Sequence, residues 1–115
     1  TLAKKWHAIV VISGAKDIVT DGTRVMHITN GCPAMSDITG SGCMCTTLIG
    51  AFVGAHPEDP FGASVAAMLS MGIAGERAWK SYGHQGLGHF HMGILDELGR
   101  MSASVMEAEG RYDIL

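Results

Sequence analysis

The chain has few basic residues and no long apolar run, and each shortage argues against a class of protein. No apolar run approaches the roughly 20 residues that a membrane-spanning helix needs, so we expect no membrane partner. The eight Lys and Arg residues are scattered and the net charge is −3. Nucleic-acid binding needs a basic patch, so we expect no nucleic-acid partner. No apolar segment follows a basic start, and we therefore expect no signal peptide.

Cysteine is also scarce, and its placement argues against a disulfide framework. Three cysteines are an odd number, and Cys43 and Cys45 are too close in sequence for an ordinary disulfide. A reducing cytoplasm is the simplest interpretation. A metal or redox pair at Cys43 and Cys45 is not expected either, because a helix would point the two side chains about 200° apart.

What the chain does have is enough apolar residues for one core. Hydrophobic residues make up 47% of 115 residues. That length suits one small domain and not two, so we expect residues 1–115 to belong to a single domain.

The first half of the chain carries strand patterns. Residues 7–13 are a continuous β-branched run stopped by Gly14, which is typical of a buried strand in a parallel sheet. Residues 17–20 and 24–29 also have strand character, and they flank Asp21-Gly22. Asp-Gly between two strands predicts a two-residue β-hairpin turn.

The second half of the chain predicts three helices. The first covers residues 42–55, and the second starts at Asp59-Pro60, where Asp is a good N-cap and Pro suits the first helical position, and runs to about residue 80. The third covers residues 91–108, with apolar residues on one face. Residues 82–90 are rich in glycine and predict a loop.

This order of strand, hairpin and helices predicts an α/β fold. We expect the trailing part of an α/β domain whose other strands are supplied elsewhere, because the opening strand would otherwise lack neighbours to cover its edges. A free-standing domain of three strands and three helices remains the alternative.

The most informative motif is the glycine-rich turn at residues 37–43, which runs into the first helix. Glycine at positions 40 and 42 leaves backbone N–H groups unobstructed, and at a helix N-terminus these groups bind anions such as phosphate. Cys43 closes the turn where the helix dipole favours a thiolate. Gly40, Ser41, Gly42 and Cys43 are therefore a candidate phosphoryl-transfer site. The alternatives are a plain tight connection and, for Cys43, a small buried helix residue.

Two other groups of polar residues have competing interpretations. Ser13 ends the first strand, at the edge where open α/β sheets bind ligands, or its hydroxyl satisfies local backbone. His84, His89 and His91 lack further ligands at zinc-site spacing, so we expect a solvated loop and no metal there. The adjacent Asp96 and Glu97 predict a solvated helix face.

The sequence Asp-Ile-Thr-Gly-Ser-Gly-Cys at residues 37–43 resembles the ribokinase-superfamily signature, in which an Asp-Thr-x-Gly-x-Gly turn ends in a catalytic Asp. A cysteine in that last position is similar to the hydroxyethylthiazole kinase family and, less closely, to hydroxymethylpyrimidine kinase. Asn-Gly-Cys-Pro-Ala-Met at 30–35 and Gly-Leu-Gly-His-Phe at 86–90 resemble the thiazole kinase motifs Asn-Gly-x-Pro-x-Met and Gly-Pro-Gly-Ser-Phe. The resemblance covers nearly the whole chain.

The resemblance implies a ribokinase-like three-layer α/β/α fold, of which this chain is the C-terminal portion. It implies ATP-dependent phosphorylation of the hydroxyethyl group of 4-methyl-5-(2-hydroxyethyl)thiazole in thiamine salvage, with ATP and Mg²⁺ as cofactors. Cys43 would accept the hydroxyl proton, Ser13 would contact ATP, and Gly40 would contact the substrate through its backbone. The family further implies a homotrimer with sites between subunits, and an upstream acidic Mg²⁺ motif that this chain lacks.

Two other functions remain open. One is a hydroxymethylpyrimidine kinase or another ribokinase-like small-molecule kinase. The other is of a different class, a non-catalytic fragment or oligomerisation module. We expect the isolated chain to be inactive, because part of the active site would come from the missing half.

Overall fold

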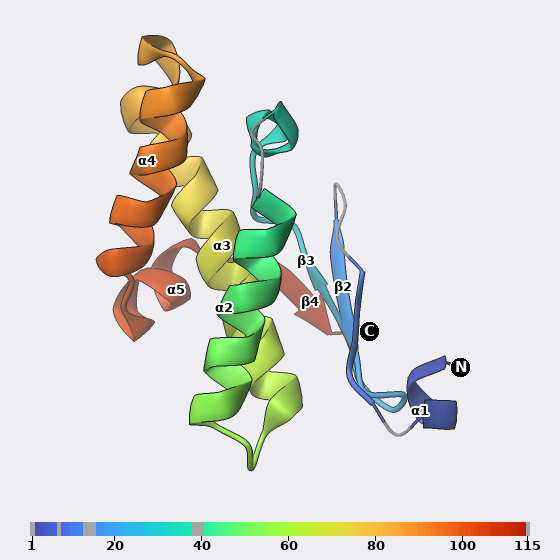
Figure 1. Cartoon of the computed structure of the whole chain (residues 1–115). Helices are drawn as coiled ribbons and strands as arrows, with labels where there is room; N and C mark the ends of the chain where they lie inside the picture. Colours follow the sequence, from blue (N-terminus) through green and yellow to red (C-terminus); the bar gives the residue numbers. More distant parts are fainter. Residues whose placement is uncertain (1, 7, 13–15, 38–40, 115) are drawn as a thin grey trace.

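The chain folds into a small sheet with helices packed on one of its faces (Figure 1). The structure is a computed structural model that describes residues 2–6, 8–12, 16–37 and 41–114. The α/β class predicted from the sequence is confirmed. No helix in these described ranges is long and apolar enough to cross a membrane.

The sheet has four strands in the order β1-β2-β3-β4, and every pairing is antiparallel. The strands are β1 (Val10–Ile12), β2 (Asp17–Thr20), β3 (Val25–Ile28) and β4 (Tyr112–Ile114). The strand predicted at residues 7–13 is present but shorter, and it is neither parallel to a described neighbour nor buried on both faces. Ile12 is 55% exposed, because the described helices cover only the other face of the sheet.

The hairpin between β2 and β3 was predicted at the correct place but with the wrong turn. Thr20 pairs with Val25, so four residues form the connection and not two. The Asp21 carboxylate explains the longer turn, because it accepts hydrogen bonds from the N–H groups of Thr23 at 2.9 Å and Arg24 at 2.7 Å. These backbone hydrogen bonds lower the pKa of Asp21 to about 2. Strand β4 and the short helix α1 (Leu2–Trp6) were not predicted.

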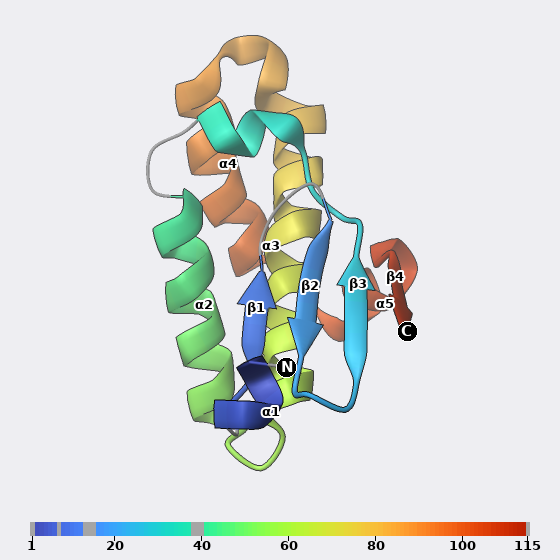
Figure 2. The same cartoon turned by 90° about the vertical axis from the view of Figure 1, so that its right-hand side faces the viewer.

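Helices α2 (Ser41–Ala55) and α3 (Pro60–Tyr82) agree with the first two predicted helices. Asp59 caps α3 as predicted: its side chain accepts a hydrogen bond from the N–H of Gly62 at 3.1 Å. Figure 2 shows α3 directly behind the strands, with α2 beside it beyond the edge of β1.

The predicted third helix is two helices, α4 (Leu87–Gly99) and α5 (Ala103–Glu109). The helix ends because Ser102 has an extended backbone and caps α5, accepting from the N–H of Val105 at 3.3 Å. The predicted loop at 82–90 is also wrong: a 3-10 turn, η2 (Gly83–Gln85), is followed by the first turns of α4. Only Gly86, with φ of 116°, interrupts the helical backbone.

Helix α3 lies in the middle of the hydrophobic core and contributes to both of its clusters. One cluster joins α3 to the sheet and contains Val19, Met26, Ile28, Phe61, Val65, Met68 and Leu69. The other joins α3 to α4 and to η1 (Pro33–Asp37), and contains Ala34, Met71, Ala74, Ala78, Phe90 and Ile94. The segment that leads to the glycine-rich turn is therefore part of the core.

Candidate active site

The first turn of α2 carries the described part of the predicted anion site. The helix begins at Ser41, and both Gly42 and Cys43 are exposed. Among the described residues, a Cβ atom at Gly42 would meet no atom within 4 Å. The backbone N–H groups of a first helical turn have no intrahelical partner and lie at the positive end of the helix dipole. This end of α2 therefore has the chemistry and the open space to receive an anion.

Two threonines follow the site on the next turn of α2. The Thr46 hydroxyl donates a hydrogen bond to the Gly42 carbonyl at 3.0 Å, and the Thr47 hydroxyl donates to the Cys43 carbonyl at 2.8 Å. These bonds occupy carbonyl oxygens of the first turn and none of its N–H groups. Neither threonine was predicted to be part of the site. Threonine hydroxyls within a helix commonly donate to the carbonyl four residues earlier, as both do here.

The two cysteines of α2 lie in different environments, as their predicted helical spacing requires. Cys43 is exposed, so its interpretation as a small buried residue is wrong. Cys45 is half buried, and its thiol donates to the Met68 sulfur at 3.1 Å. Burial raises the pKa of Cys45. Of the two thiols, Cys43 is the one that a substrate can reach.

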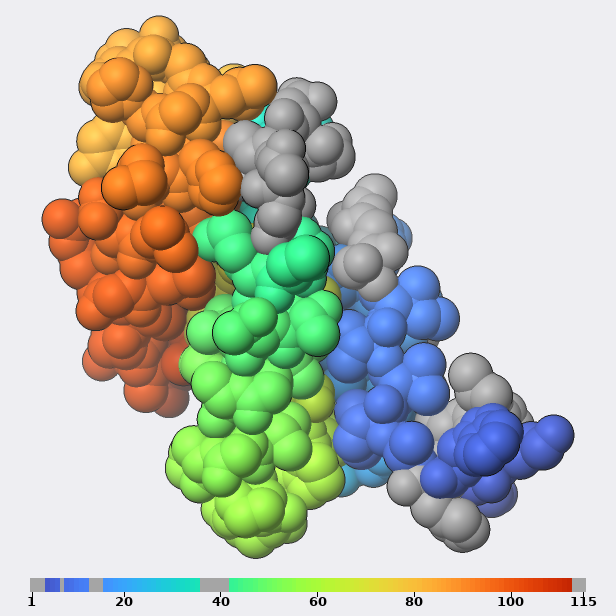
Figure 3. All heavy atoms as spheres, in the orientation of Figure 1, coloured from blue at the N-terminus to red at the C-terminus, as the bar shows by residue number. Residues whose placement is uncertain are grey.

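Two of the predicted site residues, Ser13 and Gly40, lie outside the described residues. Asp37, the first residue of the motif, ends η1, and α2 starts four positions later. The glycine-rich motif therefore connects a core-bound turn to an exposed helix start. Figure 3 shows that α2 reaches the surface as a ridge between α4 and the sheet.

The solvated helix face predicted at Asp96 and Glu97 lies on α4, and the prediction is confirmed for Asp96 but wrong for Glu97. Asp96 is exposed, but Glu97 is only 8% exposed. Its carboxylate lies 3.4 Å from Arg77 and 3.2 Å from Arg100, so two guanidinium groups neutralise it. A buried carboxylate needs such partners. The sequence could not reveal this, because Arg77 is on α3, twenty positions away.

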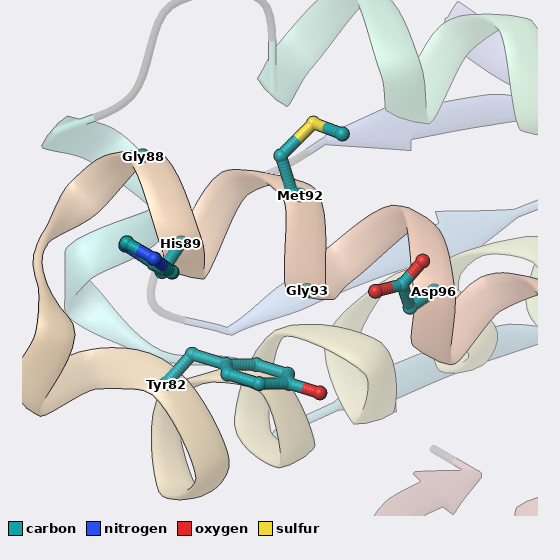
Figure 4. A pocket seen from close by; sticks show the side chains of 6 residues that line it. All are labelled: Tyr82, Gly88, His89, Met92, Gly93 and Asp96. Atoms are coloured by element: carbon teal, nitrogen blue, oxygen red, sulfur yellow. The ribbon is translucent and has the colours of Figure 1, made fainter.

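Tyr82 and one face of α4 line a shallow, open concavity of about 420 Å³ (Figure 4). Its lining residues are Tyr82, Gly88, His89, Met92, Gly93 and Asp96. The Tyr82 ring packs against Gly93, where a Cβ atom would approach it to 2.5 Å. Within the described ranges, no three His, Cys, Asp or Glu side chains are grouped so that they could hold a metal ion.

Comparison with known proteins identifies the relatives of this chain. A family model described as the hydroxyethylthiazole kinase family matches residues 1–104. A hydroxyethylthiazole kinase from Clostridium beijerinckii is 45% identical over 106 residues, covering 92% of this chain and 38% of the relative. One from Rhizobium leguminosarum bv. trifolii is 44% identical over 110 residues, covering 96% of this chain and 40% of the relative.

A solved structure gives the same result for the fold. The structure of a hydroxyethylthiazole kinase protein from Pyrococcus horikoshii OT3 superposes with a TM-score of 0.90 at 32% sequence identity. The match covers 98% of this chain and 43% of that one. The chain therefore spans about two fifths of the length of the relatives that it matches.

Proposed function

Because this chain belongs to the hydroxyethylthiazole kinase family, we propose that it is the C-terminal part of a kinase for 4-methyl-5-(2-hydroxyethyl)thiazole in thiamine salvage. Such an enzyme transfers the γ-phosphoryl group of ATP to the hydroxyl of the thiazole alcohol. The observation that carries the proposal is the first turn of α2, where Gly42 and Cys43 are exposed and a Cβ atom at Gly42 would meet no described atom within 4 Å.

The helix start is suited to the charge that develops in phosphoryl transfer. The transition state is loose, so positioning and charge stabilisation dominate catalysis. We assign charge stabilisation to the backbone N–H groups of Gly40, Ser41, Gly42 and Cys43. Fixed donors at a helix N-terminus need no reorganisation during the reaction. The open space around Gly42 supports the close approach of a phosphate to the backbone.

In this proposal Cys43 accepts the proton of the substrate hydroxyl. As the substrate hydroxyl oxygen forms its bond to the γ-phosphorus, the bond from that phosphorus to the ADP oxygen breaks. The hydroxyl proton passes to the Cys43 sulfur. The exposure of Cys43 supports this role. From the family resemblance we assign ATP contact to Ser13 and a backbone substrate contact to Gly40.

The cofactors are ATP and Mg²⁺. The exposed Gly42 and Cys43 at the start of α2 support binding of the phosphate chain of ATP there, because N–H groups at a helix N-terminus attract anions. Mg²⁺ would neutralise charge on the phosphates. The described residues hold no cluster of carboxylates and histidines for a metal, so we place the Mg²⁺ ligands in the part of the domain that precedes residue 1.

We further propose that residues 1–115 are one portion of a single ribokinase-like domain, and that the complete enzyme is a cytoplasmic homotrimer. The exposed edge of β1 and the exposed Ile12 support further strands and a second helical layer on the sheet. Three cysteines without disulfides support a reducing compartment.

The decisive experiment supplies the complete kinase with MgATP and either the thiazole alcohol or hydroxymethylpyrimidine. We expect phosphorylation of the thiazole alcohol. Phosphorylation of the pyrimidine alcohol alone would assign the enzyme to the related kinase instead. The 115-residue chain is assayed beside it for ATP consumption, and we expect none. Turnover by the isolated chain would contradict the proposal that the site is shared with the missing part.

A further inference from the structure

Asn30 is a buried amide whose hydrogen bonds are all made within the protein. It lies between β3 and η1 and is only 4% exposed. Its Nδ2 donates to the Glu76 carboxylate at 2.7 Å and to the Glu109 carbonyl at 2.9 Å. Its Oδ1 accepts from the N–H of Arg111. The side chain therefore joins the approach to the glycine-rich turn with α3 and with the C-terminal end of α5.

Two glycines of α3 let this approach lie directly on the helix backbone. A Cβ atom at Gly72 would come within 2.8 Å of the Asn30 carbonyl oxygen. A Cβ atom at Gly75 would come within 2.3 Å of the Met35 sulfur. Positions 72 and 75 are three residues apart, so they share one face of the helix. The segment from Asn30 to Met35 is fixed against this face at both of its ends.

The C-terminal segment covers the same junction. The Arg111 guanidinium contacts the Glu76 carboxylate and donates to the Thr29 carbonyl at 3.2 Å. The N–H of Thr29 donates to the Arg111 carbonyl at 2.9 Å, which continues the pairing of β3 with β4. Asn30 therefore lies beneath hydrogen bonds from residues about 80 positions away, and it cannot move without breaking them.

We propose that Asn30 is a positioning residue for phosphoryl transfer, holding η1 on α3 so that the N–H groups at the start of α2 are correctly placed. The inference rests on the proposed function. Only residues 38–40 separate η1 from α2, and three residues span at most about 10 Å. The exposed residues Gly42 and Cys43 have little packing of their own. A displacement of η1 would therefore also displace the start of α2 that follows it.

The test is Asn30→Ala in the complete kinase, with Glu97→Gln as the matched control. Both changes remove a buried polar side chain with partners on α3, but the ion pairs of Glu97 on α4 are with Arg77 and Arg100 and not with the segment from Asn30 to Met35. Each kcat and KM is measured well below the melting temperature of each variant. We expect Asn30→Ala to lower kcat about 10- to 100-fold with little change in the KM for the alcohol, since small misplacements of catalytic groups have effects of this order. Glu97→Gln should retain kcat.

Gly72→Ala provides the test should Asn30→Ala fail to fold. Alanine favours the helix more than glycine does, but its Cβ atom would displace Asn30. Gly99→Ala is its control, because a Cβ atom at Gly99 would meet no atom of the described part of the chain within 4 Å. We expect Gly72→Ala to lower kcat and Gly99→Ala to leave it unchanged.

The possible results separate this inference from the proposed function. If the wild-type kinase phosphorylates the thiazole alcohol and the folded Asn30→Ala or Gly72→Ala variant keeps its kcat, the positioning role is wrong. Equal losses of kcat in a variant and its control would also overturn it, because they would reflect general destabilisation. If the wild-type kinase phosphorylates no thiazole alcohol, the proposed function itself fails.

Discussion

Helices α2 and α3 are neighbours, yet they differ in how completely the chain covers them. Helix α3 contacts the sheet on one side and α4 on the other, and most of its residues are buried. Helix α2 has no charged residue, and none of its described side chains is buried. A helix that is apolar around most of its surface is normally covered on all sides.

The difference indicates that this chain covers most of the surface of α3 but leaves much of the apolar surface of α2 exposed. Most residues of α3 are buried, and the helix contributes to the two core clusters that this chain forms. Helix α2 lies beside the open edge of β1 and needs further contacts to cover it. This supports the proposal that the remaining part of the domain packs on α2, where it would also complete the active site.

The largest expected effect is at the start of α2. In the complete kinase, Cys43→Ala should lower kcat by roughly 10²–10⁴-fold, the usual cost of losing acid–base catalysis. Cys43→Asp should keep or improve the rate, because a carboxylate is more fully ionised at neutral pH. Steady-state kinetics with the thiazole alcohol check both variants. An unchanged rate for Cys43→Ala would remove Cys43 from the mechanism.

The next largest effect is expected when a buried residue of α3 and a partly buried residue of α2 are each replaced by alanine. Ile73 on α3 is fully buried, whereas Ile49 on α2 is only partly buried. Ile73→Ala should lower the free energy of unfolding of this chain by about 2–5 kcal/mol. Ile49→Ala should cost about 1 kcal/mol, because less apolar area is lost. Urea denaturation measures both, and equal losses would contradict the contrast between the helices.

A smaller effect is expected where α3 begins. Asp59→Ala removes the side chain that accepts the Gly62 N–H. We expect a loss of about 1 kcal/mol, typical of an N-cap. Asp59→Asn is the control, since an amide oxygen can accept the same bond, and it should cost only part of this. Thermal unfolding by circular dichroism distinguishes the two; identical losses would show that the cap does not stabilise α3.

The smallest effect tests whether α2 is covered in the complete enzyme. A Cβ atom at Gly50 would meet no atom within 4 Å in the ranges that the structure describes. Gly50→Ala should therefore stabilise the 115-residue chain by roughly 0.5–1 kcal/mol through helix propensity. In the complete kinase the gain should disappear, because the added methyl group would meet the covering part. A gain of the same size in both proteins would mean that this face of α2 stays in water.

Much of the fold could be predicted because its signals are local. The cap at Asp59 and the apolar run that follows predict α3, and the glycine-rich turn predicts the start of α2. The errors have non-local causes. The β4 strand depends on pairing with β3, which lies more than 80 positions away. The break before α5 depends on the backbone of Ser102, and not on the apolar periodicity that continues through it.

The candidate site could be predicted only in part, for the same reason. Residues 40–43 form one continuous motif, and the exposure of Cys43 agrees with the predicted role. The group around Asn30 was not predicted, because its members come from β3, α3 and the C-terminal segment. A polar residue between a strand and a proline suggests a turn, and nothing nearby in the sequence indicates that it is buried.

The open edge of β1 has a practical consequence for work with this chain. Among the described strands β1 lies at the edge of the sheet and carries the exposed Ile12, and such an edge is a template for pairing with another copy. Self-association of the purified 115-residue chain would then reflect this edge and not the native subunit contacts. If the remaining part of the domain supplies a strand to this edge, as proposed, co-expression with that part should suppress the self-association.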